Sequence, residues 1–181
     1  MRRNLRNAFE EKSWAGKKGS APRSGPGSTL DQTKQLRDAL PRLFDQYGVK
    51  TLLDAPCGDW FWMQHVDLSG ISYIGGDISK AVIDANAAEF TRPGASFLHL
   101  DITSDALPAA DMILCRDCMM HLKDWLRWAF FENFVASEAK YLMTTVHHVL
   151  ENRPVVNNGG FKRFNPPAPP FNFAPALELI P

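Results

Sequence analysis

Five short apolar runs lie between residues 49 and 146, and turn-forming or helix-forming residues separate them. The runs predict strands at 49–55, 71–74, 96–100, 112–115 and 141–146. Helical spacing of apolar side chains predicts helices at 79–90, capped by Ser79, and at 122–134. Strands that alternate with helices predict an α/β fold of the Rossmann-like, doubly wound kind, with a mainly parallel sheet and helices on both faces.

A further helix is predicted ahead of the first strand. Apolar side chains recur at helical spacing over 36–47, and Gly48 is placed to end the helix. Thr29 and Gln32 form a capping-box pattern at its start. Pro41 lies inside this span, where a proline kinks a helix or marks its boundary.

The C-terminal part of the chain offers few strand signals. The segment 176–180 is a candidate sixth strand, and a seventh strand is missing. We therefore expect a sheet of five to six strands. A sheet that stops short leaves an exposed edge, which favours a homodimer.

Acidic residues stand at the ends of the predicted strands, where open parallel sheets bind their ligands. Asp54 ends the first strand, and Asp77 ends the second, nineteen residues after Gly58. This spacing is typical of nucleotide-binding folds, in which the second carboxylate binds ribose hydroxyls. The intervening turn has Pro56 and Trp60 where a dinucleotide site has glycines, so a ligand without phosphates fits better and a nicotinamide-dependent oxidoreductase is disfavoured.

Three motifs resemble those of one known family. Residues 24–30 read SGPGSTL, residues 54–60 read DAPCGDW, and residues 115–118 read CRDC, with Asp77 and Asp101 at the ends of two further strands. Together they resemble the class I S-adenosylmethionine-dependent methyltransferases, and in particular small, largely uncharacterised members. The resemblance runs from about residue 29 to residue 146. It implies S-adenosylmethionine as the cofactor and methyl transfer to a small-molecule oxygen or nitrogen acceptor.

The resemblance also implies roles for individual residues. Asp77 would hold the ribose hydroxyls, Asp101 the adenine amino group, and the backbone of 55–58 would face the methionine carboxylate. The isoleucines after the second and third strands would sandwich the adenine. The implied cofactor-binding residues are Asp54, Ala55, Pro56, Cys57, Gly58, Asp77, Ile78, Asp101, Ile102, Cys115 and Arg116. Residues 1–28 would form a basic arm, hinged at 25–27, that closes as a lid over a domain spanning 29–181.

A general base would assist transfer to a hydroxyl or a protonated amine. The candidates after the fourth and fifth strands are Asp117, His121 and His147, with His148 beside the last. Arg116 is also a plausible anchor for an acidic acceptor.

Two other patterns carry weaker alternatives. Cys115, Cys118 and His121 have metal-ligand spacing, but a single C-x-x-C pair is a weak signal and we predict no metal. Asn165, Pro166 and Pro167 resemble the N-P-P motif of amino-methylating enzymes, although a proline-rich loop explains them better.

Charge adds to this picture. Residues 1–50 carry 11 basic and 5 acidic groups, and the remaining residues carry 9 and 15. An acidic body is compatible with a cationic ligand. The zero net charge excludes an obviously basic nucleic-acid binder, so nucleic acid is not an expected partner.

Length and cysteine content bear on the setting. The 181 residues suit one domain of ordinary size. No apolar run approaches the roughly 18 residues of a membrane helix, and no secretory signal is evident. Three cysteines in such a chain indicate a reducing compartment, so we expect a cytoplasmic protein. A non-catalytic module that binds S-adenosylmethionine or its demethylated product, or a truncated methyltransferase, stays open as an alternative.

Overall fold

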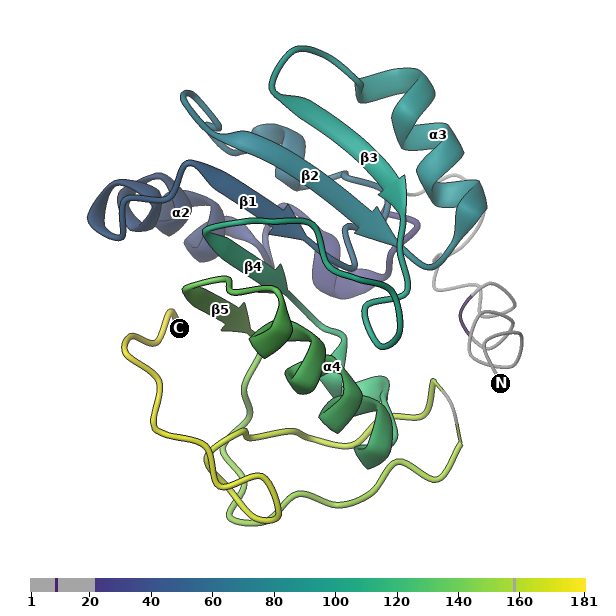
Figure 1. Cartoon of the computed structure of the whole chain (residues 1–181), viewed down its shortest axis with the longest axis vertical. Coiled ribbons are helices and arrows are strands. Elements are labelled where there is room, and N and C mark those ends of the chain that lie inside the picture. The colour runs from purple at the N-terminus through teal and green to yellow at the C-terminus, as the bar shows by residue number, and fades with distance from the viewer. Residues whose placement is uncertain (1–8, 10–21, 158) are drawn as a thin grey trace.

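The sheet confirms the predicted α/β architecture. The computed structural model describes residues 9, 22–157 and 159–181. Its sheet has five strands in the order β3-β2-β1-β4-β5, and every neighbouring pair is parallel (Figure 1). The strands are β1 (Thr51–Asp54), β2 (Ser72–Asp77), β3 (Ala95–His99), β4 (Met112–Cys115) and β5 (Tyr141–Thr144).

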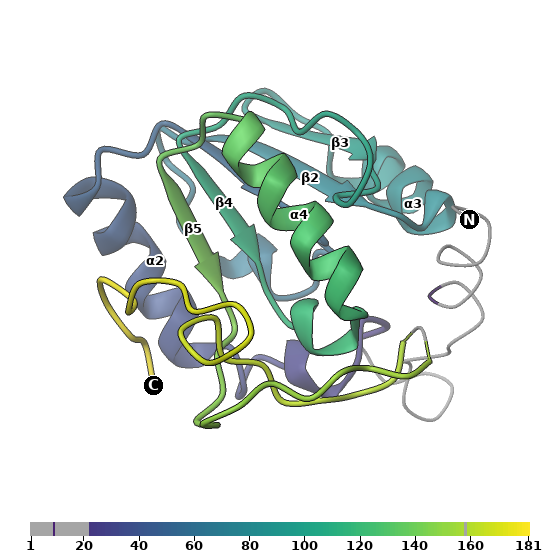
Figure 2. The same cartoon turned by 60° about the horizontal axis from the view of Figure 1, so that its bottom comes forward.

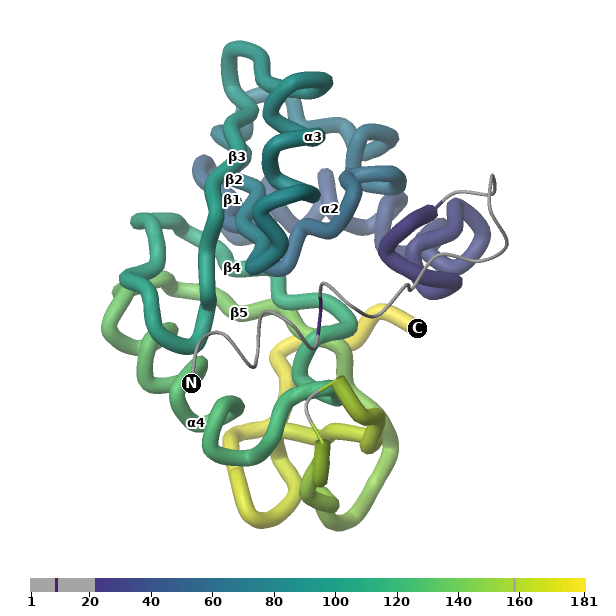
Figure 3. Tube along the Cα trace, turned by 90° about the vertical axis from the view of Figure 1, so that its right-hand side faces the viewer, coloured from purple at the N-terminus to yellow at the C-terminus, as the bar shows by residue number. Residues whose placement is uncertain are grey.

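Helices cover both faces of this sheet, as predicted. Seen along the sheet, α2 (Lys34–Gln46) and α3 (Lys80–Phe90) lie on one side and α4 (Asp124–Ala136) lies on the other (Figure 3). Three short 3-10 turns are η1 (Pro26–Ser28), η2 (Met63–His65) and η3 (Met119–His121). Among the described helices, none is both long and apolar enough to cross a membrane.

Alternating residues of the central strands supply two cores. Leu52 and Leu114 point into the layer beneath α2, while Leu53 and Ile113 point into the layer beneath α4. This alternation follows from the period of two in a strand. Because both faces are covered, the central strands are apolar at nearly every position, which is why they read as continuous runs in the sequence.

One of the two predicted helix caps is confirmed, and the other lies ahead of the helix that it was expected to start. The Ser79 hydroxyl accepts the Val82 N–H at 3.5 Å, as expected for the cap of α3. The Thr29 hydroxyl accepts the Gln32 N–H at 3.4 Å, but residues 29–33 form turns and α2 begins only at Lys34. Pro41 lies within α2 and does not bound it, because Leu40, Leu43 and Phe44 remain buried on the same face.

The connection between β1 and β2 contains no α-helix to cover the sheet. It contains only η2, and Trp60 itself fills the core with none of its surface exposed. The Trp60 ring centroid lies 4.9 Å from that of Phe90, 5.4 Å from Phe97 and 5.6 Å from Tyr73. This side chain thus substitutes for helix packing on that face.

The predicted strand at 176–180 is wrong. The segment has no regular structure, and Glu178 forms an ion pair with Arg42 of α2. Pro175 and Pro181 flank the segment and cannot donate to a strand ladder. Figure 2 shows the C-terminus close to α2 and to β5, which is the edge strand of the described sheet. The homodimer stays a prediction.

The long coil after β5 is held together by one buried amide. Asn152 is 5% exposed, and its Nδ2 donates to the carbonyls of Asn165, Ala168 and Pro169 at 2.8–3.0 Å. Its Oδ1 accepts the Asn165 N–H at 2.8 Å. Asn165 in turn donates from its side chain to the Val149 carbonyl, so this asparagine of the N-P-P pattern has a structural role in the loop.

Replacing Asn152 by alanine is therefore expected to destabilise the protein. The variant leaves several buried carbonyls and one N–H without their partner, at a cost of about 3 kcal/mol. Urea unfolding measures this loss, and Asn157→Ala, an exposed asparagine of the same coil, is the matched control. Equal stability of the two variants would contradict the role given to Asn152.

Candidate functional site

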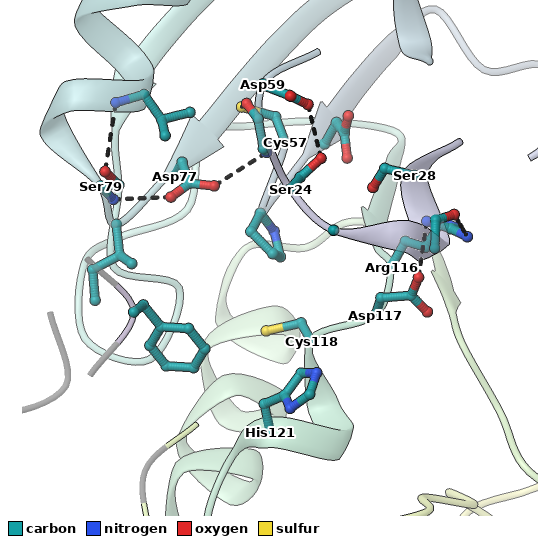
Figure 4. Close-up of a pocket in the computed structure, with 18 of the residues that line it drawn as sticks. Ser24, Ser28, Cys57, Asp59, Asp77, Ser79, Arg116, Asp117, Cys118 and His121 are labelled. Carbon is teal, nitrogen blue, oxygen red and sulfur yellow. Dashed lines mark hydrogen bonds and ion pairs between the residues drawn. The ribbon is translucent and has the colours of Figure 1, made fainter. Parts of the chain in front are cut away.

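A cavity of about 550 Å³ opens at the carboxyl ends of β1, β2, β3 and β4. Its walls come from residues 23–28, the turn after β1, the residues after β2 and β3, and the chain from Arg116 to Leu122. In Figure 4, Asp77 and Ser79 lie on one side of this cavity, and Arg116, Asp117, Cys118 and His121 lie across from them.

The turn after β1 is held tightly by its own N–H groups. Ala55 donates to the Leu114 carbonyl at 2.9 Å, and Cys57 donates to the Gly76 carbonyl at 2.8 Å. The Gly58 N–H donates to Asp77 Oδ2 at 3.1 Å, and Pro56 has no N–H. The turn was expected to face a carboxylate, but each of these N–H groups already has an acceptor within the chain.

Asp77 joins three parts of the site. Besides the bond from Gly58, its Oδ1 accepts the Ser79 N–H at 2.9 Å. Burial raises the pKa of Asp77, although these backbone hydrogen bonds act in the opposite direction. A carboxylate has about four lone-pair sites, so Asp77 can still accept a hydrogen bond from a ligand.

Asp101 is fixed in a similar way at the end of β3. Its Oδ1 accepts both the N–H and the hydroxyl of Thr103, at 2.9 and 2.6 Å. Asp101 and Ile102 are each 8% exposed, and both line the cavity, as does Ile78 after β2. After both β2 and β3, the cavity is therefore lined by a carboxylate followed by an isoleucine.

Asp54 is the most deeply buried acid of the cavity, with 2% of its surface exposed. Burial raises its pKa to about 7, while a 2.7 Å hydrogen bond from the Tyr73 hydroxyl and the charge of Arg116 act to lower it. The carboxyl is thus poised to ionise near neutral pH. A cation placed beside it would favour the ionised form.

Residues 23–28 form a strap across the cavity, joined to its walls by polar contacts. Asp59 accepts the Ser24 hydroxyl at 2.7 Å and the Arg23 N–H at 2.5 Å. At the other end of the strap, Arg116 donates from Nη2 to the Gly27 carbonyl at 2.8 Å. The strap lines the cavity, so the packed part of the chain includes residues that were expected to belong to the arm. Most of the arm lies outside the described residues.

Arg116 and Asp117 form a closed network beside the strap. Arg116 Nη1 is 2.9 Å from Asp117 Oδ2, and the guanidinium carbon lies 5.6 Å from the ring centroid of Trp62. Asp117 Oδ1 accepts the Thr145 hydroxyl at 2.9 Å, and the Asp117 N–H donates back to that oxygen. Both carboxylate oxygens of Asp117 are therefore engaged.

His121 lines the cavity and His147 does not. The Nδ1 of His121 lies 2.7 Å from the Gly160 carbonyl, and its ring centroid is 5.8 Å from that of Phe161. The Nδ1 of His147 accepts the Phe164 N–H at 3.3 Å, which places this histidine in the framework of the C-terminal coil.

The structure brings together most of the predicted site residues. The cavity is lined by Asp54, Pro56, Cys57, Gly58, Asp77, Ile78, Asp101, Ile102, Arg116, Asp117 and His121. It does not include Ala55, Cys115 or His147: the first two are fully buried in the core beneath α4. Their functional roles stay predictions.

Some lining residues were not predicted as site residues. Asp59 and Trp62 follow the first turn closely, and their position after a strand was a usable signal. No sequence signal pointed to Phe161, because it reaches the cavity from a coil far along the chain.

In the described part of the chain, no group of three or more histidine, cysteine or acidic side chains is placed to hold a metal ion. Burial raises the pKa of the Cys57 and Cys115 thiols well above their usual range, which keeps them protonated and poor as metal ligands.

Comparisons with solved structures identify the fold. A 1,6-didemethyltoxoflavin-N1-methyltransferase from Burkholderia thailandensis, solved with 1,6-didemethyltoxoflavin and S-adenosylhomocysteine, is 16% identical over 91% of this chain and 72% of its own, with a TM-score of 0.61. The protein in the DhpI–SAH complex is 17% identical over 91% of this chain and 77% of its own, with a TM-score of 0.53. The methyltransferase domain of bacterial CtHen1 is 14% identical over 64% of this chain and 65% of its own, with a TM-score of 0.54.

These likenesses establish that the chain has the class I methyltransferase fold. Neither protein-family models nor curated protein sequences match the chain. The chain spans 65% of the CtHen1 domain, and 44% of human N-acetylserotonin methyltransferase, a further structure that it matches.

Alanine at Gly58 is expected to destabilise the turn through two effects. Gly58 has a φ of 56°, and an added Cβ would lie 2.9 Å from the Cβ of Ser24. Gly70 has a φ of 76° with no atom within 4 Å of such a Cβ, so Gly70→Ala is the matched control that carries the backbone cost alone. We expect Gly58→Ala to lower the free energy of unfolding by at least about 1 kcal/mol more than the control.

Thermal or urea unfolding measures this difference. The double variant Gly58→Ala with Ser24→Gly removes the contact and should recover part of the loss. Equal effects of the two alanine substitutions would show that the strap does not press on the turn.

The pH dependence of stability tests the state of Asp54. Its pKa rises from 3.8 when exposed to about 7 in the fold, so between these values the folded state binds a proton that the unfolded chain lacks. Stability is therefore lost as the pH rises through this window, by at most about 1.4 kcal/mol per pH unit. Asp54→Asn keeps an acceptor for Tyr73, and the wild-type protein should lose stability relative to this variant from pH 4 to 7. Parallel curves for the two proteins would contradict the raised pKa.

Proposed function

We propose that this protein binds S-adenosylmethionine and transfers its methyl group to a small molecule. The observation that carries the proposal is the convergence of Asp54, Asp77 and Asp101 from the ends of three adjacent strands into one cavity. These residues were predicted from the sequence for this cofactor. The methyltransferase fold supports the same assignment.

The chemistry of the adenosine end fits the residues present. Asp77 can accept a hydrogen bond from a ribose hydroxyl, and Asp101 offers a carboxylate oxygen to an exocyclic amino group. Ile78 and Ile102 supply apolar faces on which an adenine ring can pack. The turn contains a single glycine and buries Trp60 behind it, which suits a ligand that brings no phosphate.

The charges of the site are complementary to the amino-acid end of S-adenosylmethionine. The sulfonium and the ammonium are both cations, and the carboxyls of Asp54 and Asp77 stand nearby, with pKa values that burial has raised. A cation bound beside these carboxyls would offset the free-energy cost of ionising them in a buried position. The N–H groups of the turn are used within the chain, so the guanidinium of Arg116 is the group we assign to the cofactor carboxylate.

The role of the protein in such a transfer is to align the reactants and exclude water, since the cofactor supplies the electrophilic methyl group. The strap contributes a wall that Asp59 and Arg116 hold closed. In this proposal, residues 1–28 act as a lid hinged at 25–27, and opening the lid admits the ligands.

A non-catalytic binding module is the second candidate. It is favoured by the turn, because the N–H groups of Ala55, Cys57 and Gly58 donate to acceptors within the chain. Formation of S-adenosylhomocysteine with any member of a broad acceptor panel supports transfer. Binding without turnover on every acceptor favours the module.

Calorimetric titration with S-adenosylmethionine tests the cofactor. Asp77→Ala is expected to weaken binding by at least about tenfold, because charge-assisted hydrogen bonds to the ribose are lost. Asp84→Ala, which removes an exposed carboxylate that pairs with Lys80 on α3, is the control and should bind as the wild type does. A folded wild-type protein that does not bind would refute the proposal. Unchanged affinity in Asp77→Ala would refute the assignment of the ribose site.

A further inference from the structure

Tyr73 is a buried tyrosine whose hydroxyl has no part in the function proposed above. It lies in β2, and only 1% of its surface is exposed. Its hydroxyl donates to Asp54 Oδ2 at 2.7 Å, and Asp54 is the most deeply buried acid of the cavity. An ionised carboxylate in a core needs such a donor, so this contact bears directly on the charge that Asp54 can carry.

The register of the sheet explains how the two side chains meet. Tyr73 stands opposite Leu52 in the parallel pairing of β1 and β2. Asp54, two residues further along β1, stands opposite Gly75. Because Gly75 has no side chain, the Tyr73 ring can lie over it, and a Cβ at Gly75 would be 3.1 Å from Tyr73 Cε1. The ring thus reaches along β2 and brings its hydroxyl to the carboxyl at the end of β1.

Aromatic neighbours and burial keep this hydroxyl in place as a donor. The Tyr73 ring centroid lies 5.6 Å from that of Trp60 and 5.9 Å from that of Phe97. Burial raises the pKa of the Tyr73 hydroxyl well above its usual range, and the charge of Asp54 acts in the same direction. The hydroxyl therefore keeps its proton across the neutral pH range.

Asp54 has one oxygen bonded to Tyr73 and lines the cavity proposed to hold the cofactor. Burial raises its pKa to about 7, the Tyr73 hydroxyl and the charge of Arg116 lower it, and the charge of Asp77 raises it. Titratable or charged groups that interact with Asp54 come from the turn after β1, from β2 and from the end of β4, and they are Cys57, Tyr73, Asp77, Cys115 and Arg116. Of these five, Tyr73 is the hydrogen-bond donor to the carboxylate.

We propose that Tyr73 is a positioning residue that holds Asp54 as the anionic partner of the cationic cofactor. This inference rests on the proposed function. When S-adenosylmethionine binds, the Asp54 carboxyl releases its proton to solvent, and the Tyr73 hydroxyl donates to the resulting carboxylate. Hydrogen bonds to an ionised acceptor are roughly twice as strong as those to a neutral one, so Tyr73 favours the form that the cofactor requires.

Tyr73→Phe is expected to weaken cofactor binding only at those pH values at which Asp54 must ionise on binding. The variant lacks the donor, so Asp54 ionises at higher pH. If the ionisation moves upward by about one pH unit, the dissociation constant for S-adenosylmethionine should rise about tenfold at pH 6 and about twofold or less at pH 8. A purely structural loss would weaken binding by the same factor at every pH.

Calorimetric titration with S-adenosylmethionine at pH 6, 7 and 8 measures the ratio of the dissociation constants of variant and wild type. This ratio cancels the titration of the amino group of the cofactor, which is common to both proteins. Tyr141→Phe removes a phenol hydroxyl from β5, outside the cavity, and is the matched control, with an expected ratio near one. A ratio for Tyr73→Phe that does not change with pH would overturn the proposal.

A second background locates the titrating group. In Asp54→Asn no carboxyl titrates at position 54, so adding Tyr73→Phe should change the affinity by one factor throughout pH 6 to 8. A factor that still fell with rising pH would assign the titration to another group, and Tyr73 would then have no role through Asp54.

The wild-type protein provides a test that requires no variant to fold. Tyr73 is the one buried tyrosine among the three of the chain, so its hydroxyl proton is the one most protected from exchange with water. In proton NMR at pH 6 this resonance should move downfield when S-adenosylmethionine binds, because the acceptor gains a charge. An unchanged resonance in the complex would contradict the proposal.

The outcomes separate this inference from the function on which it rests. A folded wild-type protein that does not bind S-adenosylmethionine at any of these pH values would refute the proposed function. Binding by the wild type together with a pH-independent ratio for Tyr73→Phe would refute the role of Tyr73 and leave the cofactor assignment standing.

Discussion

The hydrogen bond from the Gly58 N–H to the Asp77 carboxylate is the contact on which the site depends. It ties the turn after β1 to the end of β2, and the Asn86 amide holds the carbonyl of the same glycine at 2.8 Å. The turn can approach so closely because Gly58 has no side chain to meet Ser24 of the strap. The backbone of Gly58 thus links Asp77 at the end of β2, Asn86 of α3 and the strap that forms a wall of the cavity.

Burial makes it costly to ionise the acids of the cavity. Burial raises the pKa values of both Asp54 and Asp77, so each ionised carboxylate opposes folding near neutral pH. A bound cation would offset this cost. The stability of the fold and the affinity for a cationic ligand are therefore linked through the same two groups.

The residues that the sequence predicted well are those whose roles are local. The places of Asp54 and Asp77 at strand ends, and of Asp101 two residues after β3, follow from apolar runs. The Ser79 cap follows from its place before a helix. Trp60 and Phe161 were missed because their environments depend on contacts from distant parts of the chain. The segment 176–180 has strand-like composition, but Pro175 and Pro181 flank it and cannot donate to a strand ladder, and its Glu178 pairs with Arg42 of α2.

The two ends of the cavity have different structural origins. The carboxylate end is built by the sheet, whose parallel register brings the ends of β1, β2 and β3 together. The end of the cavity that Cys118, Met120 and Phe161 line is built where the coil after β5 meets η3, through bonds at Gly160 and Lys162. Because the coil has no ladder of its own, the buried Asn152 amide fixes its path instead. The sheet and the coil thus contribute separate walls to one cavity, and the wall from the coil can change without altering the strand ends that place the carboxylates.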